Sequence, residues 1–175
     1  MPPEAQGTLD YHIRVLGVYR HSQYNIPEEA QCAGPDVAAY VTDPLCAFTP
    51  TTLRDQFVSQ VNLNGSGRSI NHGNVAREFF CLSQPGAPAD AQGRSFRSGV
   101  TFSGTCGGLS DSTVAVLPTH PYLSCGDRVY IHTVGTKDIT DLCPGCAQAQ
   151  LDNFTTDGSC SSVTDLGNFM TIKLF

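Results

Sequence analysis

Eight cysteines, spread between residues 32 and 160, constrain the fold of this 175-residue chain more than any other feature of its sequence. They are Cys32, Cys46, Cys81, Cys106, Cys125, Cys143, Cys146 and Cys160. The even count predicts up to four disulfides and an oxidising compartment. A reduced protein with a zinc site is disfavoured, because the single CxxC pair has no second ligand pair to complete a tetrahedral shell. The connectivity stays open, since eight cysteines allow about 105 pairings.

The composition predicts a β-rich chain and excludes some classes of function. Glycine (17) and proline (11) are plentiful and only 15% of residues are charged, which favours many turns around one core over a helical or disordered chain. The net charge of −6 argues against a nucleic-acid binder, which needs a basic face. No apolar stretch has transmembrane length, so membrane insertion is not expected. We predict a secreted monomer without a metal or cofactor.

Hydrophobic periodicity predicts where the regular elements lie. Residues 8–19 alternate apolar and polar positions and predict a strand, followed by a loop to about residue 50. The spacing of Leu53, Phe57 and Val61 predicts the single helix, about ten residues long, with Thr52 and Asp55 as start signals. Residues 83–99 predict a turn-rich surface loop.

The second half of the chain is dense in short strand patterns. They are "VTFSGT" (100–105), "STVAVLP" (112–118), "DRVYIHTVG" (127–135), "KDITDL" (137–142) and the terminal "NFMTIKLF" (168–175). Short strands at this spacing favour a barrel or a sandwich. We see no linker and no internal repeat, and therefore predict one domain over residues 1–175, with a loop insertion near 83–99.

Two aspartates eleven residues apart flank a tight turn in "ITDLCPGCAQAQLDNF" (139–154). Pro144 and Gly145 interrupt helical periodicity, so Asp141 and Asp152 can meet only if β structure folds back between them. The "CPGC" turn could be a redox pair, but it follows a strand and opens no long helix that would lower the pKa of a thiol. A structural role for the turn is therefore favoured.

Three segments, taken in chain order, resemble a known family. They are "VNLNGSGRSINHG" (61–73), "STVAVLPTHPYLSCGDRVYI" (112–131) and "ITDLCPGCAQAQLDNF" (139–154). Together they resemble the catalytic core of membrane-bound lytic transglycosylase A and the related three-aspartate domains, which are double-psi β-barrels akin to expansins, barwin-like proteins and family 45 endoglucanases. The "CPGC…LD" portion looks more like the expansin and barwin branch. The resemblance implies a mainly β fold, a six-stranded double-psi β-barrel with one or more short helices and long disulfide-bonded loops.

The resemblance also implies the site residues. Asp141 and Asp152 match two family aspartates in kind and spacing, and the second of these is the catalytic acid in the family. The segment matching the family's glycan-groove "GSG", together with one candidate stacking ring, predicts substrate binding by Asn64, Gly65, Ser66, Gly67 and Tyr122. Tyr19, Tyr24 and Phe102 are further stacking candidates. Three features depart from the family: Leu117 replaces its first signature aspartate, "CPG" replaces Gly-Gly, and no lysine follows in that turn.

The implied substrate is the β-1,4 bond between N-acetylmuramic acid and N-acetylglucosamine in peptidoglycan. Cleavage needs a proton donor, and a carboxylic acid serves if burial or a nearby carboxylate raises its pKa. We expect Asp152 to be that acid and Asp141 to orient it, raise its pKa or help to activate water. Hydrolysis of the muramidase type is favoured over transglycosylation, with Asp141, Glu78 or Asp138 as the second carboxylate.

Three other classes of function stay open. A β-glucan endoglucanase on the same barrel is disfavoured by the "NLNGSG" segment. An expansin- or barwin-like module that binds walls or acts in defence needs no catalytic acid, although the absence of Trp disfavours binding to flat cellulose. A small secreted protease inhibitor is the third alternative.

Overall fold

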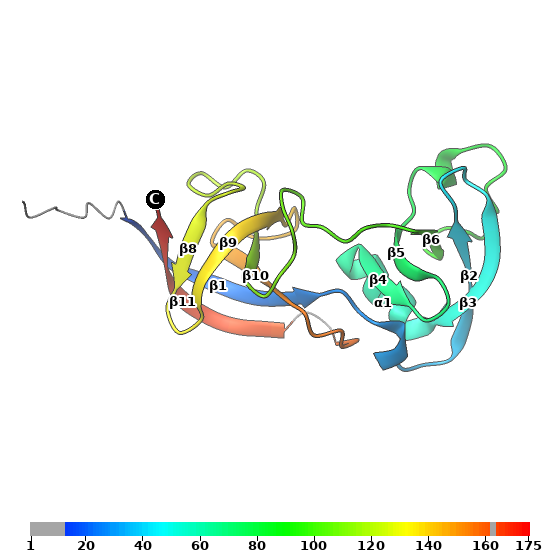
Figure 1. Cartoon of the computed structure of the whole chain (residues 1–175), viewed down its shortest axis with the longest axis horizontal. Helices are drawn as coiled ribbons and strands as arrows, with labels where there is room; N and C mark the ends of the chain where they lie inside the picture. The colour runs from blue at the N-terminus through cyan, green and yellow to red at the C-terminus, as the bar shows by residue number, and fades with distance from the viewer. Residues whose placement is uncertain (1–12, 162–163) are drawn as a thin grey trace, which may run out of the picture.

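The computed structural model describes residues 13–161 and 164–175, which form two parts that lie side by side (Figure 1). One part is a closed β-barrel, and the other is a five-stranded sheet that carries the only α-helix of the described residues. The second part is inserted in sequence between the first and second strands of the barrel. No helix among the described residues is long and apolar enough to cross a membrane.

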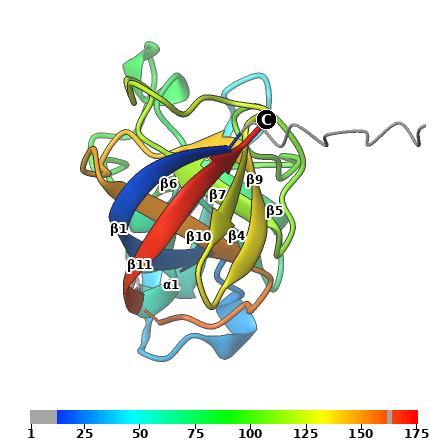
Figure 2. The same ribbon diagram turned by 90° about the vertical axis from the view of Figure 1, so that its left-hand side faces the viewer.

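The barrel contains six strands in the order β1-β10-β7-β9-β8-β11, and β11 pairs with β1 to close it (Figure 2). The strands are β1 (Ile13–Asn25), β7 (Thr113–Val116), β8 (Arg128–Ile131), β9 (Gly135–Leu142), β10 (Gln150–Thr155) and β11 (Thr164–Leu174). The pairs β1–β10 and β7–β9 are parallel and the others antiparallel. The predicted mainly β fold with a six-stranded barrel is therefore confirmed.

Alternation along the strands builds the barrel interior. On β7, Val114 and Val116 are fully buried in a cluster with Ile131, Ile139 and Leu151. Side chains at alternate positions project to opposite faces of a sheet, so Ala115, between the two valines, points to the outer wall of the barrel. This parity decides which residues of β1, β9 and β10 can form a site on that wall.

The second part has a core of its own. Its sheet has the order β3-β2-β6-β5-β4, from β2 (Asp36–Thr42), β3 (Phe48–Arg54), β4 (Ser66–Ser69), β5 (Gly73–Arg77) and β6 (Ser95–Ser98). Helix α1 (Asp55–Asn64) buries Phe57, Val58 and Val61 against this sheet. Two short 3-10 turns, η1 (Glu29–Gln31) and η2 (Cys81–Ser83), complete the part.

Several local predictions were wrong in the second part. The ten-residue helix is confirmed, but it begins at Asp55, because Thr52 lies on β3. The predicted loop before residue 50 contains β2 and the start of β3, and the predicted loop 83–99 contains β6. Residues 100–105 form no strand and contain only an isolated bridge at Gly104. Of the predicted first strand, residues 8–12 lie outside the described residues.

All eight cysteines pair, as Cys32–Cys160, Cys46–Cys81, Cys106–Cys125 and Cys143–Cys146, which confirms the predicted four disulfides and fits an oxidising compartment. The first spans 128 residues of sequence and joins the segment after β10 to the second part. In the loop-entropy model a cross-link of this span stabilises the fold by about 5 kcal/mol. Hydrogen bonds from the Glu28 amide to the Gly158 carbonyl and from the Gln56 side chain to the Cys160 carbonyl support the same junction.

Each part surrounds a separate hydrophobic cluster. The sequence predicted a single domain over residues 1–175, and this stays a prediction. It holds if the two clusters unfold together.

Candidate functional site

Asp141 and Asp152 flank the same residue of the central strand. Asp152 on β10 pairs with Ala115 on β7, and Asp141 on β9 pairs with the same Ala115 from the other side. Ser22 on β1 pairs with Asp152 and extends the row to four strands. Strands two apart in a sheet are separated by about 9–10 Å, so the two aspartates share one face of the wall with only a methyl group between them. The "CPGC" turn reverses the chain from β9 to β10 and makes this register possible.

An irregularity in β9 brings Asp141 into the row. Val114 pairs with Ile139 but the next residue, Ala115, pairs with Asp141, so Thr140 is an extra residue on β9. Such a bulge re-aims the side chains that follow it. Gly104 packs directly on the Thr140 carbonyl and beside the Asp141 Cβ, where any side chain would collide with the backbone. The bulge is therefore held from outside by a residue that must be glycine.

The row opens into a cleft of about 380 Å³ on the outer wall of the barrel. The end of helix α1 contributes Leu63 and Asn64, and the barrel contributes the remaining lining residues: Ser22, Tyr24, Ala115, Asp141, Leu142, Cys143, Pro144, Gly145, Gln150 and Asp152. The two aspartates are the only charged residues among them. The volume lies within the usual range for ligand sites, and the cleft offers negative charge without a competing cation.

Four hydrogen bonds hold the carboxylate of Asp141. The Thr105 amide and hydroxyl each donate to Oδ1 at 2.8 Å, the Leu142 amide donates to the same oxygen at 2.9 Å, and the Tyr24 hydroxyl donates to Oδ2 at 2.7 Å. An ionised carboxylate accepts hydrogen bonds at both oxygens and donates none. The four donors therefore fix Asp141 in one orientation in the wall of the cleft.

Asp152 has a different environment. The Ser22 hydroxyl donates to its Oδ1 at 2.7 Å, the only hydrogen bond that this carboxyl group makes within the described residues. Burial raises the pKa of Asp152, the Ser22 hydrogen bond lowers it, and the charge of Asp141 raises it again, with a net upward shift. The pair therefore consists of one carboxyl group held by four donors and one whose pKa is raised, a contrast of environments like that between a base and an acid.

Three residues that support the aspartates escaped the functional prediction. Ser22 and Gln150 were not predicted at all, and Tyr24 was predicted only as a stacking ring. Gln150 donates to the Ser22 hydroxyl at 3.0 Å, which leaves the Ser22 proton for Asp152. Burial and the hydrogen bond to Asp141 raise the pKa of Tyr24, so its hydroxyl remains a neutral donor. No local pattern in the sequence marks these three residues, because the pairing of β1 with β10 is what places them beside the aspartates.

The predicted "NGSG" binding segment divides into one cleft residue and three others. Asn64 lines the cleft. Gly65 ends helix α1 in a left-handed conformation and donates its amide to the Val61 carbonyl. Gly67 lies against helix α1, where a Cβ would come within 2.6 Å of Val61. Among the described lining residues only Asn64 comes from this segment, and Ser66 begins β4 outside it.

The predicted aromatic platforms also separate. Tyr122 does not line the cleft. Its ring instead makes a cation–π contact with Arg14, whose guanidinium carbon lies 3.7 Å from the ring centre. Tyr19 is 6% exposed and belongs to the barrel core. Phe102 lines a neighbouring cavity of about 300 Å³, and Tyr24 lines the cleft itself. Tyr24 is therefore the stacking candidate that the fold places beside the aspartates.

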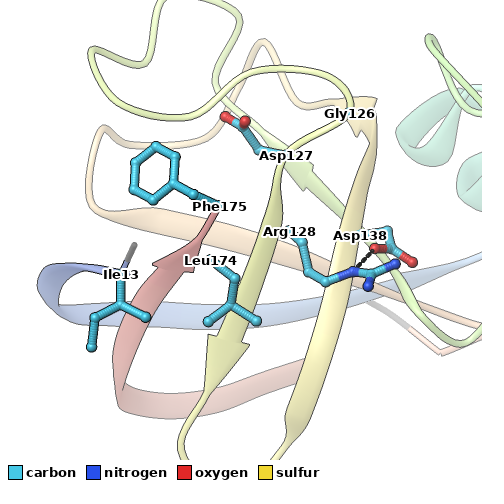
Figure 3. A pocket seen from close by; sticks show the side chains of 7 residues that line it. All are labelled: Ile13, Gly126, Asp127, Arg128, Asp138, Leu174 and Phe175. Carbon is cyan, nitrogen blue, oxygen red and sulfur yellow. Dashed lines mark hydrogen bonds and ion pairs between the residues drawn. The ribbon is translucent and has the colours of Figure 1, made fainter. Parts of the chain in front are cut away.

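The other two candidate carboxylates are neutralised elsewhere. Asp138 accepts from the Arg128 Nε at 2.7 Å in a separate cavity of about 560 Å³, lined also by Ile13, Gly126, Asp127, Leu174 and Phe175 (Figure 3). Glu78 is buried in the second part. Burial raises its pKa, but hydrogen bonds from Arg97, the Cys81 amide and Thr42 hold that pKa below the usual range. Of the three candidates for a second carboxylate, Asp141 alone lines the cleft of Asp152.

Comparison of the sequence with protein-family models and with curated proteins finds no match to either. The closed six-stranded mixed barrel and its disulfides are consistent with the double-psi architecture implied by the sequence resemblance. The case for a function therefore comes from the geometry of the cleft together with that resemblance.

Proposed function

We propose that this protein is a glycosidase that cleaves the β-1,4 bond between N-acetylmuramic acid and N-acetylglucosamine in bacterial peptidoglycan. The observation that carries the proposal is the pair of unlike carboxyl groups in one cleft, with the pKa of Asp152 raised beside Asp141, whose two oxygens are held by hydrogen-bond donors. The substrate class comes from the resemblance of the three sequence segments to wall-cleaving double-psi barrels, and secretion fits both the substrate and the disulfides.

In this mechanism Asp152 donates its proton to the bridging oxygen as the bond breaks. The sugar ring then develops positive charge, which the fixed negative charge of Asp141 stabilises. Tyr24 holds Asp141 in place and offers its ring to the sugar, while Asn64 supplies an amide for N-acetyl or hydroxyl groups. Because Asp141 provides a second carboxylate, hydrolysis by water is favoured over internal attack by the muramoyl 6-hydroxyl.

Clearing of Gram-positive wall suspensions by the wild type, Asp152→Asn, Asp141→Asn and Asp138→Asn tests the proposal. We expect Asp152→Asn to lose about 10²–10⁴-fold in rate, the range typical of general acid catalysis. Asp138→Asn is the matched control, since it removes a carboxylate from β9 outside the cleft and should leave the rate unchanged. An Asp152→Asn variant that retains more than about a hundredth of the wild-type rate excludes the general acid role.

Product masses separate the reaction types, because a hydrolysed end carries one water more than a 1,6-anhydro end. Anhydro products would retain Asp152 as the acid but replace hydrolysis by transglycosylation. Binding of the wild type to walls without any clearing would reject catalysis and favour the wall-binding alternative.

A further inference from the structure

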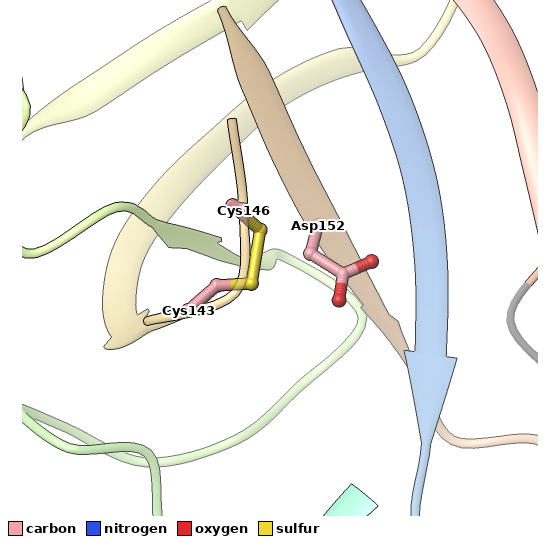
Figure 4. A group of neighbouring side chains, drawn as sticks. All are labelled: Cys143, Cys146 and Asp152. Atoms are coloured by element: carbon pink, nitrogen blue, oxygen red, sulfur yellow. A yellow bond between two sulfur atoms is a disulfide. The ribbon is translucent and has the colours of Figure 1, made fainter. Parts of the chain in front are cut away.

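The Cys143–Cys146 disulfide lies directly against Asp152 on the rim of the cleft (Figure 4). The two sulfur atoms and a carboxylate oxygen all lie within 4.8 Å of one another. Cys146 is buried, and Cys143 and Asp152 are half-buried. Among the described residues, no other three side chains of His, Cys, Asp or Glu bring their ligand atoms this close.

The spacing and the distances suit a metal once the disulfide is open. Two cysteines separated by two residues are a common source of two zinc ligands, and a tetrahedral zinc with bonds of about 2.3 Å holds its sulfurs about 3.8 Å apart. The four-residue "CPGC" turn needs only a small opening to reach that separation. The carboxylate oxygen, already within 4.8 Å of both sulfurs, needs only a small side-chain rotation to complete the set.

We propose that reduction of the Cys143–Cys146 disulfide creates a binding site for one Zn²⁺ ion, held by the two thiolates and by Asp152. A dithiol reductant supplies two electrons and two protons, becomes a disulfide itself, and leaves two thiols on the chain. Zinc then displaces the two thiol protons, which pass to water. The two thiolates select a soft cation over Mg²⁺ or Ca²⁺, and the cleft provides a water molecule for the fourth position.

A metal at this site would occupy the carboxylate that the proposed glycosidase uses as its acid. Reduction in the presence of zinc would then silence wall clearing, a consequence that rests on the proposed function. The metal site itself does not rest on the proposed function, because it depends only on three ligand atoms and on the fold that positions them. Metal binding is therefore measured directly and without substrate.

The experiment reduces the folded protein with a water-soluble phosphine, which adds no thiolates of its own, and removes it without air before titration with Co²⁺ and then Zn²⁺. The Cys106–Cys125 pair is exposed and is expected to open as well, so thiol mapping by mass spectrometry identifies the open pairs. The matched control is the Cys143→Ser/Cys146→Ser variant, which keeps the other three disulfides. Asp152→Asn tests the third ligand, and Asp138→Asn controls for the loss of a carboxylate outside the cleft.

We expect the reduced wild type to bind one Co²⁺ with a thiolate charge-transfer band, and Zn²⁺ to displace it. The band should be absent from the double serine variant. Asp152→Asn should weaken zinc binding by at least about tenfold, while Asp138→Asn should leave it unchanged. The proposal is overturned by an equal band in the double serine variant, by unchanged zinc affinity in Asp152→Asn, by a Cys143–Cys146 pair that stays closed, or by loss of the fold upon reduction.

Discussion

Acid should destabilise this protein through His21, the most deeply buried of its described histidines. Its side chain is 0% exposed and lies on the inner side of β1, where Nε2 contacts the Thr171 hydroxyl at 3.2 Å and Nδ1 contacts the Asn153 amide at 3.2 Å. Burial lowers the pKa of His21 from its ordinary value of 6.5 to about 4. Neither partner carries a charge that could compensate a protonated ring.

The sign and size of the effect follow from these two pKa values. Between pH 6.5 and 4 the unfolded chain binds a proton that the folded chain rejects, so the free energy of unfolding falls as the pH falls. The part of the free energy of unfolding that depends on a neutral His21 is fully present above pH 6.5. It is lost progressively as the pH falls toward 4. A difference of this size corresponds to about 3 kcal/mol, a large part of the stability of an ordinary domain.

Urea unfolding at pH 7 and pH 4 measures this loss in the wild type, His21→Gln and His132→Gln. His132 is exposed and serves as the matched control. Acid also weakens carboxylates with lowered pKa, such as Glu78 and Asp127, but this background is common to all three proteins. We expect His132→Gln to lose as much stability as the wild type, and His21→Gln to lose about 3 kcal/mol less.

An NMR titration of the imidazole carbons gives a second measurement that does not depend on how well His21→Gln folds. His21 in the wild type should remain neutral down to about pH 4. A midpoint near 6.5, or identical acid losses in all three proteins, would refute the reasoning. If the reasoning holds, unfolding caused by protonation of His21 limits activity at low pH. The proposed mechanism works in the opposite direction, because it needs Asp152 in its protonated form.

Four further predictions concern the cleft and the two parts of the fold. The Tyr24→Phe substitution removes the hydroxyl that donates to Asp141 and should slow wall clearing at least about tenfold, because a hydrogen bond to a carboxylate is lost. The control Tyr40→Phe breaks a similar hydrogen bond, from Tyr40 to Asp90 in the second part, and should leave the rate of clearing unchanged. Gly67→Ala should lower the free energy of unfolding by about 1–3 kcal/mol, since its Cβ meets the underside of helix α1, and a denaturation midpoint equal to wild type would contradict that packing. Asn64 lies in a glycosylation sequon but should carry no glycan when the protein is made by a glycosylating host; a glycan found there by mass spectrometry would fill the cleft and move the binding groove elsewhere. Thermal unfolding should show one cooperative transition by calorimetry if the two clusters form one domain, and two separate transitions would show that they do not.

Local patterns in the sequence predicted a good part of this protein. Apolar alternation predicted several of the barrel strands and the cysteine count predicted four disulfides, because each is a property of neighbouring residues or of composition. The second sheet was missed for the same reason. Its strand β3 contains Pro50 and its strand β6 lies in a segment rich in turn residues, so pairing with β2, rather than local preference, makes them strands.

The chemistry of the cleft was decided by contacts that join distant parts of the chain. The sequence by itself determined that two aspartates would flank a tight turn, since their spacing is covalent. Only the tertiary structure decided that Ser22, 130 residues away, would hold Asp152 and that Tyr24, 117 residues away, would hold Asp141. Strand register and one extra residue in β9 fix these partners, and both depend on the free energy of the whole barrel rather than on any local preference.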